Sequence, residues 1–232
     1  MKKVLFLFIT FIGFSTLAFS SGCKKTDGTA SKISQLRDGI YIAEDDEMKI
    51  EVFSEMRESP FIEDGNPSEL KPLIVIRVTP VGDSEAENAD MFACVETKDE
   101  KYSAQFVFKP ISPRRECYIR PKSKLRGNFT LIITINGEKK KFVPTAVNLE
   151  NTIGYERAIS AIKSSDGGKL SEYFSNEEYG EIMIRLIEND GALYWYVGFT
   201  DGNETTAYLV DGKTAEILES RTSPVEKINK SV

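Results

Sequence analysis

The chain has 232 residues, which is enough for two small domains, and its net charge of −6 argues against general nucleic-acid binding. It contains no histidine, which excludes Ser-His and Cys-His nucleophile pairs and every zinc site that uses histidine. Carboxylate-only chemistry such as glycoside hydrolysis survives this exclusion, but no acidic pair stands out from the turn residues. We therefore expect a protein that is not an enzyme and that uses no cofactor and no metal.

The first 22 residues have the anatomy of an export signal. Lys2 and Lys3 are followed by an apolar run over residues 4–14, and the small residues 20–22 stand directly before Cys23. This arrangement resembles the lipobox signals of bacterial lipoproteins. The resemblance implies that residues 1–22 are removed as a signal peptide and that Cys23 receives acyl chains. It also implies an extracytoplasmic protein that is anchored to a membrane of the cell envelope.

Two other outcomes fit this N-terminus, plain secretion and an uncleaved transmembrane anchor. A membrane-spanning helix needs about 20 apolar residues, and this run is interrupted by serines and a threonine before Cys23. Lipidation of Cys23 is therefore the interpretation that we adopt. The polar and small residues that follow predict a flexible tether over residues 23–37, which would lift the folded part away from the membrane.

Residues 38–147 predict an antiparallel β domain. Short apolar segments alternate with turn residues, and Asn136-Gly137 is a strong hairpin signal. The expected strands lie near 40–42, 50–52, 73–78, 92–94, 102–108, 117–119, 129–135 and 139–143. This region resembles an immunoglobulin-like β-sandwich, and the same pattern also fits a barrel.

Cys94 and Cys117 are the two thiols that remain once Cys23 is lipidated. Each flanks an apolar strand segment, as a bridge between two sheets would require, and an oxidising compartment favours disulfides. We predict a disulfide between Cys94 and Cys117, with two free thiols as the alternative. Neither is predicted to be catalytic, because there is no histidine to activate a thiol.

Residues 148–222 predict a helix followed by an antiparallel sheet. Apolar residues recur at helical spacing from Ala158 to Ile162, before Gly167-Gly168 ends the pattern. Trp195 belongs to a strand with strict alternation and is expected to pack beneath the helix. The remaining residues, 223–232, form a polar tail. The expected strands are 181–188, 193–199, 205–210 and 217–218.

Residues 150–220 resemble the PepSY family. The resemblance rests on Glu156–Ile159 in the helix, Leu193–Val197 in a strand, and Tyr208–Asp211 with the closing turn and strand as far as Leu218. Ala215 stands where that family usually has glycine. Known members occur in propeptides that restrain secreted peptidases and in envelope proteins. The resemblance therefore implies one main helix on an antiparallel sheet, and protein contact rather than catalysis.

Tyr194 and Tyr196 are candidate protein-contact residues. They alternate with Trp195, so they face away from the predicted helix, and exposed tyrosines on a sheet are common in protein-binding surfaces. The alternative is that both tyrosines pack against the N-terminal domain.

Lys139, Lys140 and Lys141 are candidate contacts to an anionic surface. They end a basic stretch, residues 109–141, whose side chains could meet anionic lipid headgroups or an anionic wall polymer if folding gathers them on one face. The simpler interpretation, which we favour, is a set of exposed strand residues that discourages edge pairing.

These features predict a lipid-anchored envelope protein that acts as a non-enzymatic protein-interaction or protease-regulating module. The competing interpretation is an envelope ligand-binding lipoprotein. It would take a wall polymer, an ion or a small molecule in a groove between its domains.

Overall fold

The computed structural model describes residues 28–81, 90–108, 114–165, 170, 173 and 180–225. The predicted signal peptide, the acylation site Cys23 and the last part of the polar tail, residues 226–232, lie outside these described residues. Within the described ranges, no helix is long and apolar enough to cross a membrane.

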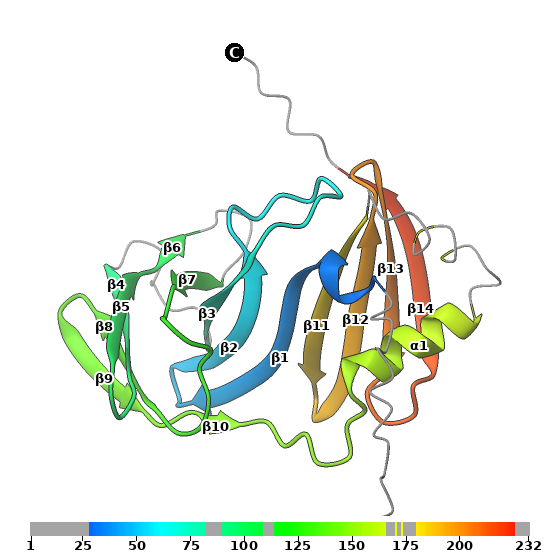
Figure 1. Ribbon diagram of the computed structural model, residues 1–232. Helices are drawn as coiled ribbons and strands as arrows, with labels where there is room; N and C mark the ends of the chain where they lie inside the picture. The colour runs from blue at the N-terminus through cyan, green and yellow to red at the C-terminus, as the bar shows by residue number, and fades with distance from the viewer. Residues whose placement is uncertain are drawn as a thin grey trace, which may run out of the picture.

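The described chain is mostly β-structure with one short α-helix (Figure 1). The helix is α1 (Tyr155–Ser165), and a 3₁₀ turn, η1 (Ala30–Lys32), precedes the first strand. The strands are β1 (Ile33–Glu44), β2 (Met48–Glu58), β3 (Leu70–Pro80), β4 (Met91–Glu96), β5 (Lys101–Gln105), β6 (Val107–Phe108), β7 (Arg115–Ile119), β8 (Thr130–Ile135), β9 (Glu138–Phe142), β10 (Thr145–Ala146), β11 (Glu181–Asn189), β12 (Ala192–Thr200), β13 (Glu204–Asp211) and β14 (Ile217–Pro224).

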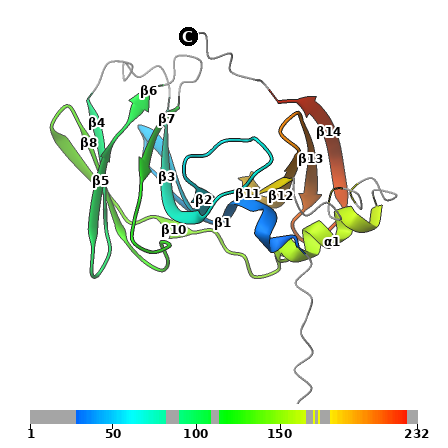
Figure 2. The ribbon, with the colours of Figure 1, turned by 45° about the horizontal axis from the view of Figure 1, so that its top comes forward.

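Ten of these strands form one large mixed sheet. Nine follow the order β14-β13-β12-β11-β1-β2-β3-β7-β6, and β10 pairs with β1. The β1–β11 pairing is parallel and the others are antiparallel. Figure 2 shows the sheet bent into an arc, with α1 and the second sheet on its outer side. We call that side the outer face, which carries Ile184 and Ile76, and the opposite side the inner face, which carries Arg37, Glu55 and Arg185.

The predicted tether is wrong for residues 33–37, which form the start of β1. This strand lies at the centre of the sheet, because it pairs with β2 along one edge and with β11 along the other. Ile33 is buried in the core beneath α1, and Leu36 packs against the same core. The sequence hid this strand because polar residues, Ser34 and Gln35, separate the two apolar side chains, and both polar residues are buried.

The second sheet has four antiparallel strands in the order β5-β4-β8-β9 and covers one half of the outer face. Its apolar side chains, among them Ala93, Val95 and Leu131, form one core with Ile74 and Ile76 of the large sheet. The hairpin predicted at Asn136-Gly137 is confirmed: it joins β8 to β9, and both residues have positive φ, 50° and 90°, as this tight turn requires.

Two packed sheets are therefore present in the N-terminal half, as expected for a sandwich. However, the larger sheet continues beyond that half: β11–β14 extend it through β1. The boundary expected near residue 147 falls just after β10, in the connection that leads to α1. At this point the chain passes from β10 to α1, while the large sheet itself continues through β11–β14.

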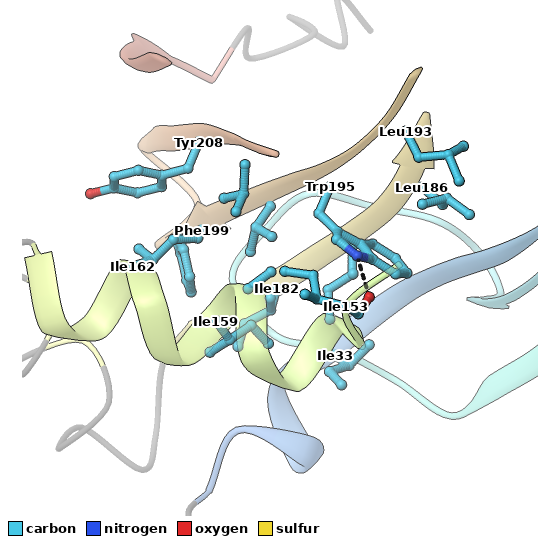
Figure 3. Packing of buried hydrophobic residues seen from close by; sticks show 14 of the residues in the cluster. Ile33, Ile153, Ile159, Ile162, Ile182, Leu186, Leu193, Trp195, Phe199 and Tyr208 are labelled. Atoms are coloured by element: carbon cyan, nitrogen blue, oxygen red, sulfur yellow. Dashed lines mark hydrogen bonds between the residues drawn. The ribbon is translucent and has the colours of Figure 1, made fainter. Parts of the chain in front are cut away.

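The helix α1 covers the other half of the outer face, as predicted for residues 148–222. Ala158, Ile159 and Ile162 are its buried residues and belong to the core with the strands beneath, as Figure 3 shows for Ile159 and Ile162. Trp195 lies beneath the helix as expected, and its indole N–H donates to the Ile153 carbonyl over 2.9 Å. The region holds four strands, β11–β14, and the last is longer than predicted because it extends to Pro224.

The assignment of faces predicts the effects of two matched substitutions in β11. Ile184→Ala removes a fully buried side chain from the core beneath α1 and should lower the free energy of unfolding by about 2–5 kcal/mol. Ile187→Ala, on the inner face of the same strand, removes a partly buried side chain and should cost less than half as much. Urea denaturation of both variants measures the difference, and equal losses would contradict the assignment.

Candidate functional site

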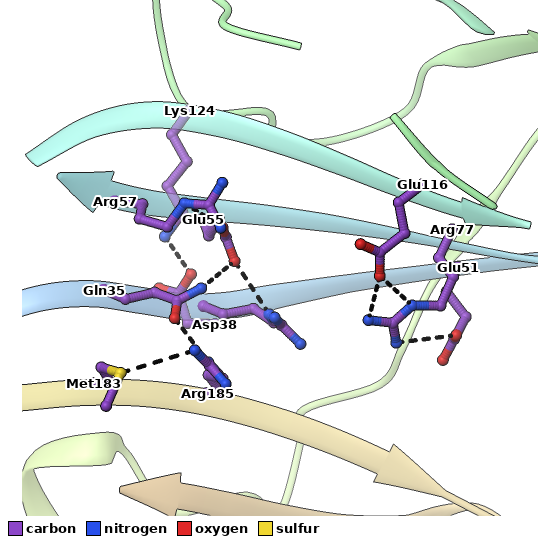
Figure 4. Close-up of polar contacts among 11 residues, drawn as sticks. Gln35, Asp38, Glu51, Glu55, Arg57, Arg77, Glu116, Lys124, Met183 and Arg185 are labelled. Carbon is purple, nitrogen blue, oxygen red and sulfur yellow. Dashed lines mark hydrogen bonds and ion pairs between the residues drawn. The ribbon is translucent and has the colours of Figure 1, made fainter. Parts of the chain in front are cut away.

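Four arginines from four neighbouring strands lie on the inner face of the sheet: Arg185 of β11, Arg37 of β1, Arg57 of β2 and Arg77 of β3. Strand register brings them together, because residues opposite each other on neighbouring strands point to the same face. Arg37 stands opposite both Arg185 and Glu55, and Arg77 stands opposite both Glu51 and Glu116. Figure 4 shows the resulting polar contacts.

Glu55 is the centre of the first group. Its side chain has no exposed surface, and its Oε2 accepts hydrogen bonds from Gln35 Nε2 at 2.8 Å and Arg37 Nε at 3.1 Å. Arg57 Nε lies 3.5 Å from the other carboxylate oxygen. Burial lowers the pKa of the Arg37 guanidinium, and Glu55 opposes this shift by its charge. One buried carboxylate therefore holds two guanidiniums in place.

Arg185 joins this group through a neutral partner. Its Nε donates to Gln35 Oε1 over 2.7 Å, and its Nη2 lies 3.8 Å from the Met183 sulfur. Within the described ranges, no carboxylate pairs with Arg185. The group formed by Gln35, Arg37, Glu55, Arg57 and Arg185, which we call the arginine cluster, therefore contains three positive charges and one negative charge.

Arg77 belongs to a separate and electrically different group. Its guanidinium lies 2.9 Å from Glu116 and 3.6 Å from Glu51, so two carboxylates surround one cation. The Tyr118 hydroxyl also donates to Glu116, over 2.6 Å. The Arg77 group therefore places two carboxylates around one cation, whereas the group around Glu55 places three cations around one carboxylate.

Aromatic rings lie against the arginines. Arg37 lies over the Phe53 ring at 4.3 Å from its centroid, and Arg77 approaches the same ring at 5.1 Å. Arg57 lies near Phe61 at 5.2 Å, and Arg185 lies over Tyr196 at 5.5 Å. A guanidinium stacked on a ring keeps its N–H groups directed outward in the plane, where a ligand can reach them.

The connection between β2 and β3, residues 59–69, crosses the inner face beside the arginine cluster. Glu58 fixes its start and its end, because this carboxylate accepts the N–H groups of Ile62 at 3.2 Å and Ser68 at 2.7 Å. At its tip, Gly65 accepts a hydrogen bond from the Gly180 N–H at 2.8 Å. The connection is therefore held both at its base, by Glu58, and at its tip, by Gly180.

The contact at the tip leaves no room for side chains. A Cβ atom on Gly65 would lie 2.9 Å from the Asp201 carbonyl carbon, and one on Gly202 would lie 2.4 Å from the Asp64 carbonyl oxygen. Gly65 also has a φ of +83°, which side-chain-bearing residues rarely adopt. Glycine at both positions lets the connection reach the turn between β12 and β13.

Glu181, at the start of β11, is buried under this connection. Its Oε2 accepts the Gly65 N–H over 3.3 Å, and its side chain is fully enclosed. Burial raises the pKa of the Glu181 carboxyl to about 7; Ser34 and Gly65 oppose the shift, and the charges of Glu58 and Glu63 add to it. The connection is therefore held by a carboxyl that titrates near neutrality.

The tyrosines predicted as protein contacts lie on the inner face, away from α1, as their alternation with Trp195 required. Both are partly buried rather than fully exposed. Burial raises the pKa of Tyr196, and the charge of Arg185 opposes the shift. Tyr196 therefore borders the arginine cluster, and Tyr194 follows it along β12.

The predicted disulfide is not formed, and Cys94 and Cys117 are free thiols. Cys117 points into the core between the two sheets, and burial raises the pKa of its thiol to about 12. Cys94 alternates with the buried residues Ala93 and Val95, so its side chain points away from that core. The sequence shows that each cysteine belongs to a strand but does not show which face of the strand it occupies.

The three lysines lie on β9, at the edge of the four-stranded sheet. Lys140 pairs with Asp45 at 3.3 Å and with Glu47 at 2.7 Å, whereas Lys139 and Lys141 are exposed. Two of the three cations thus remain available to an anionic surface, and this contact stays a prediction.

A pocket of about 280 Å³ lies between β1 and the stretches 124–126 and 146–149. It resembles the groove that a ligand-binding interpretation requires. However, Asp38 and Lys124 at its edge pair with each other, and the Ser54 hydroxyl donates to the Leu125 carbonyl over 2.8 Å. These polar groups of the pocket are therefore already paired within the chain. On the inner face, by contrast, Arg185 has guanidinium donors that pair with no carboxylate of the described residues.

No family model matches this chain, and no curated protein matches it. The chain is similar to a crystal structure described as a "putative lipoprotein" from Clostridium difficile 630, with 8% sequence identity. The match covers 59% of this chain and 84% of that chain, with a TM-score of 0.25. A TM-score this low does not establish a shared fold, and the PepSY-like and immunoglobulin-like resemblances remain hypotheses.

The arginine cluster was missed in the sequence, although a signal for it exists. In β2, Glu51, Phe53, Glu55 and Arg57 occupy every second position, so the charges alternate with the apolar or small residues that face the second sheet. This pattern is also that of a strand with a solvated face. Only the pairing with β1 and β11 shows that Glu55 is buried.

Removal of the central carboxylate should destabilise the fold. Glu55→Gln leaves Arg37 and Arg57 without their shared counter-charge, and we expect a loss of about 3–5 kcal/mol in the free energy of unfolding. Glu51→Gln is the matched control, because Arg77 keeps its ion pair with Glu116, and it should cost about 1 kcal/mol or less. Urea denaturation at pH 7 distinguishes the two, and equal losses would show that Glu55 has no special role.

The raised pKa of Glu181 predicts a stability that falls as pH rises. Between its unfolded value of 4.5 and its folded value of about 7, the folded state keeps a proton that the unfolded state has lost. The free energy of unfolding should therefore decrease by up to about 1.4 kcal/mol per pH unit in this window. Glu181→Gln should remove this slope, and Glu219→Gln, at an exposed position of β14, should keep it. Thermal unfolding from pH 5 to pH 8 measures both, and an unchanged slope in Glu181→Gln would refute the assignment.

Proposed function

We propose that this protein is a lipid-anchored, extracytoplasmic lipoprotein that works as a non-enzymatic binding protein for another envelope protein. Its N-terminal signal resembles that of lipoproteins, with Cys23 as the acylated residue. Its recognition surface is the inner face of the large sheet. A partner restrained or scaffolded in this way could be a protease, as the PepSY-like resemblance of residues 150–220 implies.

The observation that carries the proposal is the arginine cluster. Arginine and tyrosine are enriched at the centres of protein interfaces, and the partly exposed Arg185 and Tyr196 lie together here. Gln35 and Glu55 are buried, with exposed fractions of 1% and 0%, and their hydrogen bonds fix the side chains of Arg37 and Arg185. Side chains fixed before binding lose little conformational entropy when a partner arrives.

A second candidate function is the binding of an anionic wall polymer or small ligand. The excess positive charge of the arginine cluster favours it, because phosphate and carboxylate groups both fit an arginine fork. The partly buried apolar residues beside the cluster, Ile187 and Tyr194, favour a protein partner instead. We therefore place the protein partner first.

Photo-crosslinking in living host cells tests the recognition surface. A benzoylphenylalanine at position 194, on the inner face, should give adducts with an envelope protein. The same group at position 92, where Phe92 is 43% exposed on the other sheet, should give few or none. Adducts that form equally at both positions, or only at position 92, would show that the inner face is not the recognition surface.

Substitution of the acylation site tests the anchor. Cys23→Ser should abolish incorporation of radiolabelled palmitate and should move the protein from the membrane fraction to the soluble envelope fraction, because no acyl chain remains to hold it. Cys94→Ser is the matched control and should change neither result. Palmitate that persists in Cys23→Ser would contradict lipidation at this residue.

A further inference from the structure

We propose that the segment bound by the inner face is acidic and that the guanidinium of Arg185 holds one of its carboxylates. This inference rests on the proposed binding function and specifies the chemistry of the partner. It concerns Arg185 because the other two arginines of the arginine cluster form ion pairs with Glu55. Arg185 forms no ion pair with a carboxylate of the described residues.

The donors of Arg185 are only partly used. A guanidinium has five N–H groups, and the contacts of Arg185 to Gln35 at 2.7 Å and to the Met183 sulfur at 3.8 Å occupy two of them. Arg185 is partly exposed, so the remaining donors can be reached from the inner face. A carboxylate accepts two parallel N–H groups from such a fork, which gives direction as well as affinity.

The neighbourhood of Arg185 reinforces the preference for an anion. Arg37 stands opposite it in the register of β1 and β11; burial lowers the pKa of the Arg37 guanidinium, and the charge of Arg185 adds to this lowering. Glu55 compensates Arg37 and Arg57 but contacts Arg185 only through Gln35. The charge of Glu63 reaches Tyr196 from the connection between β2 and β3, but no carboxylate of the described residues forms an ion pair with Arg185. An incoming carboxylate would therefore supply that ion pair and offset the repulsion between Arg185 and Arg37.

The geometry also indicates why the anion belongs to a protein segment. Tyr196 lies against Arg185, and the partly buried side chains of Ile187 and Tyr194 continue along the same face. A peptide that alternates acidic and apolar residues would use both surfaces. A phosphate-rich polymer would use the charge and leave the apolar side chains without a partner.

The test uses the full mature chain with Cys23→Ser and a short fluorescein-labelled peptide in which glutamates alternate with leucines and glycines. A second peptide carries glutamine in place of each glutamate. Fluorescence anisotropy should show that the glutamate peptide binds at least about tenfold more tightly than the glutamine peptide. Arg185→Gln should remove this difference, and Arg185→Lys should restore only part of it, because lysine has no fork.

Arg157→Gln is the matched control, since it removes the same charge from an exposed position of α1 and should leave binding unchanged. If a variant is unstable, the comparison of the glutamate and glutamine peptides still tests the inference, because both are measured on the chain with Arg185 in place. The inference is overturned if the unaltered chain binds neither peptide, if it binds both equally, or if Arg185→Gln binds the glutamate peptide normally. It is also overturned if poly(glycerol phosphate) displaces the peptide at lower concentration, which would identify an anionic polymer as the ligand.

The cell experiment separates this inference from the proposed function. If crosslinks at position 194 are lost in the Arg185→Gln background, the two stand together. If they persist there, the inner face binds a partner by other chemistry and only the inference fails. If the crosslinks never form, the proposed function itself fails.

Discussion

The parallel pairing of β1 with β11 is the interaction on which the rest of the structure depends. It joins two stretches of chain that lie far apart in sequence, and it turns what would be two sheets into one. Because register fixes which residues face each other, this single pairing places Arg37 opposite Arg185 and Gln35 beside Met183. The arginine cluster exists only when both halves of the chain are folded and joined.

That pairing also places two positive charges, Arg37 and Arg185, opposite each other, and the fold offsets their repulsion only in part. Like charges directly opposite each other on neighbouring strands are unfavourable. Glu55 resolves the conflict for Arg37 and Arg57, and the neutral amide of Gln35 links Arg185 to this arrangement without adding charge. A glutamate at position 35 would have reduced the surplus from two positive charges to one. The chain instead has an amide there, so the inner face keeps its positive charge.

The parts of the fold that could be predicted are those governed by nearby residues. Asn136-Gly137 determines a hairpin through backbone conformations that few residues adopt, and the alternation around Trp195 determines which side of β12 meets α1. The start of β1 could not be predicted, because Ser34 and Gln35 are polar yet buried, and their burial depends on partners about 150 positions away. The same reason explains the wrong disulfide: strand membership is local, whereas the face that Cys94 occupies is set by pairing with β5 and β8.

The central position of β1 has a mechanical consequence. If the proposed acyl anchor at Cys23 holds this chain to a membrane, a pull from that membrane enters the folded part through β1, which begins at Ile33 and is bonded to β2 on one side and β11 on the other. Such a force acts along the strand, so many hydrogen bonds must break together before it moves. An edge strand such as β14, loaded from its end, would peel away bond by bond. With the proposed anchor, the load would therefore fall on a central strand that is bonded along both edges, the same strand that contributes Gln35 and Arg37 to the arginine cluster.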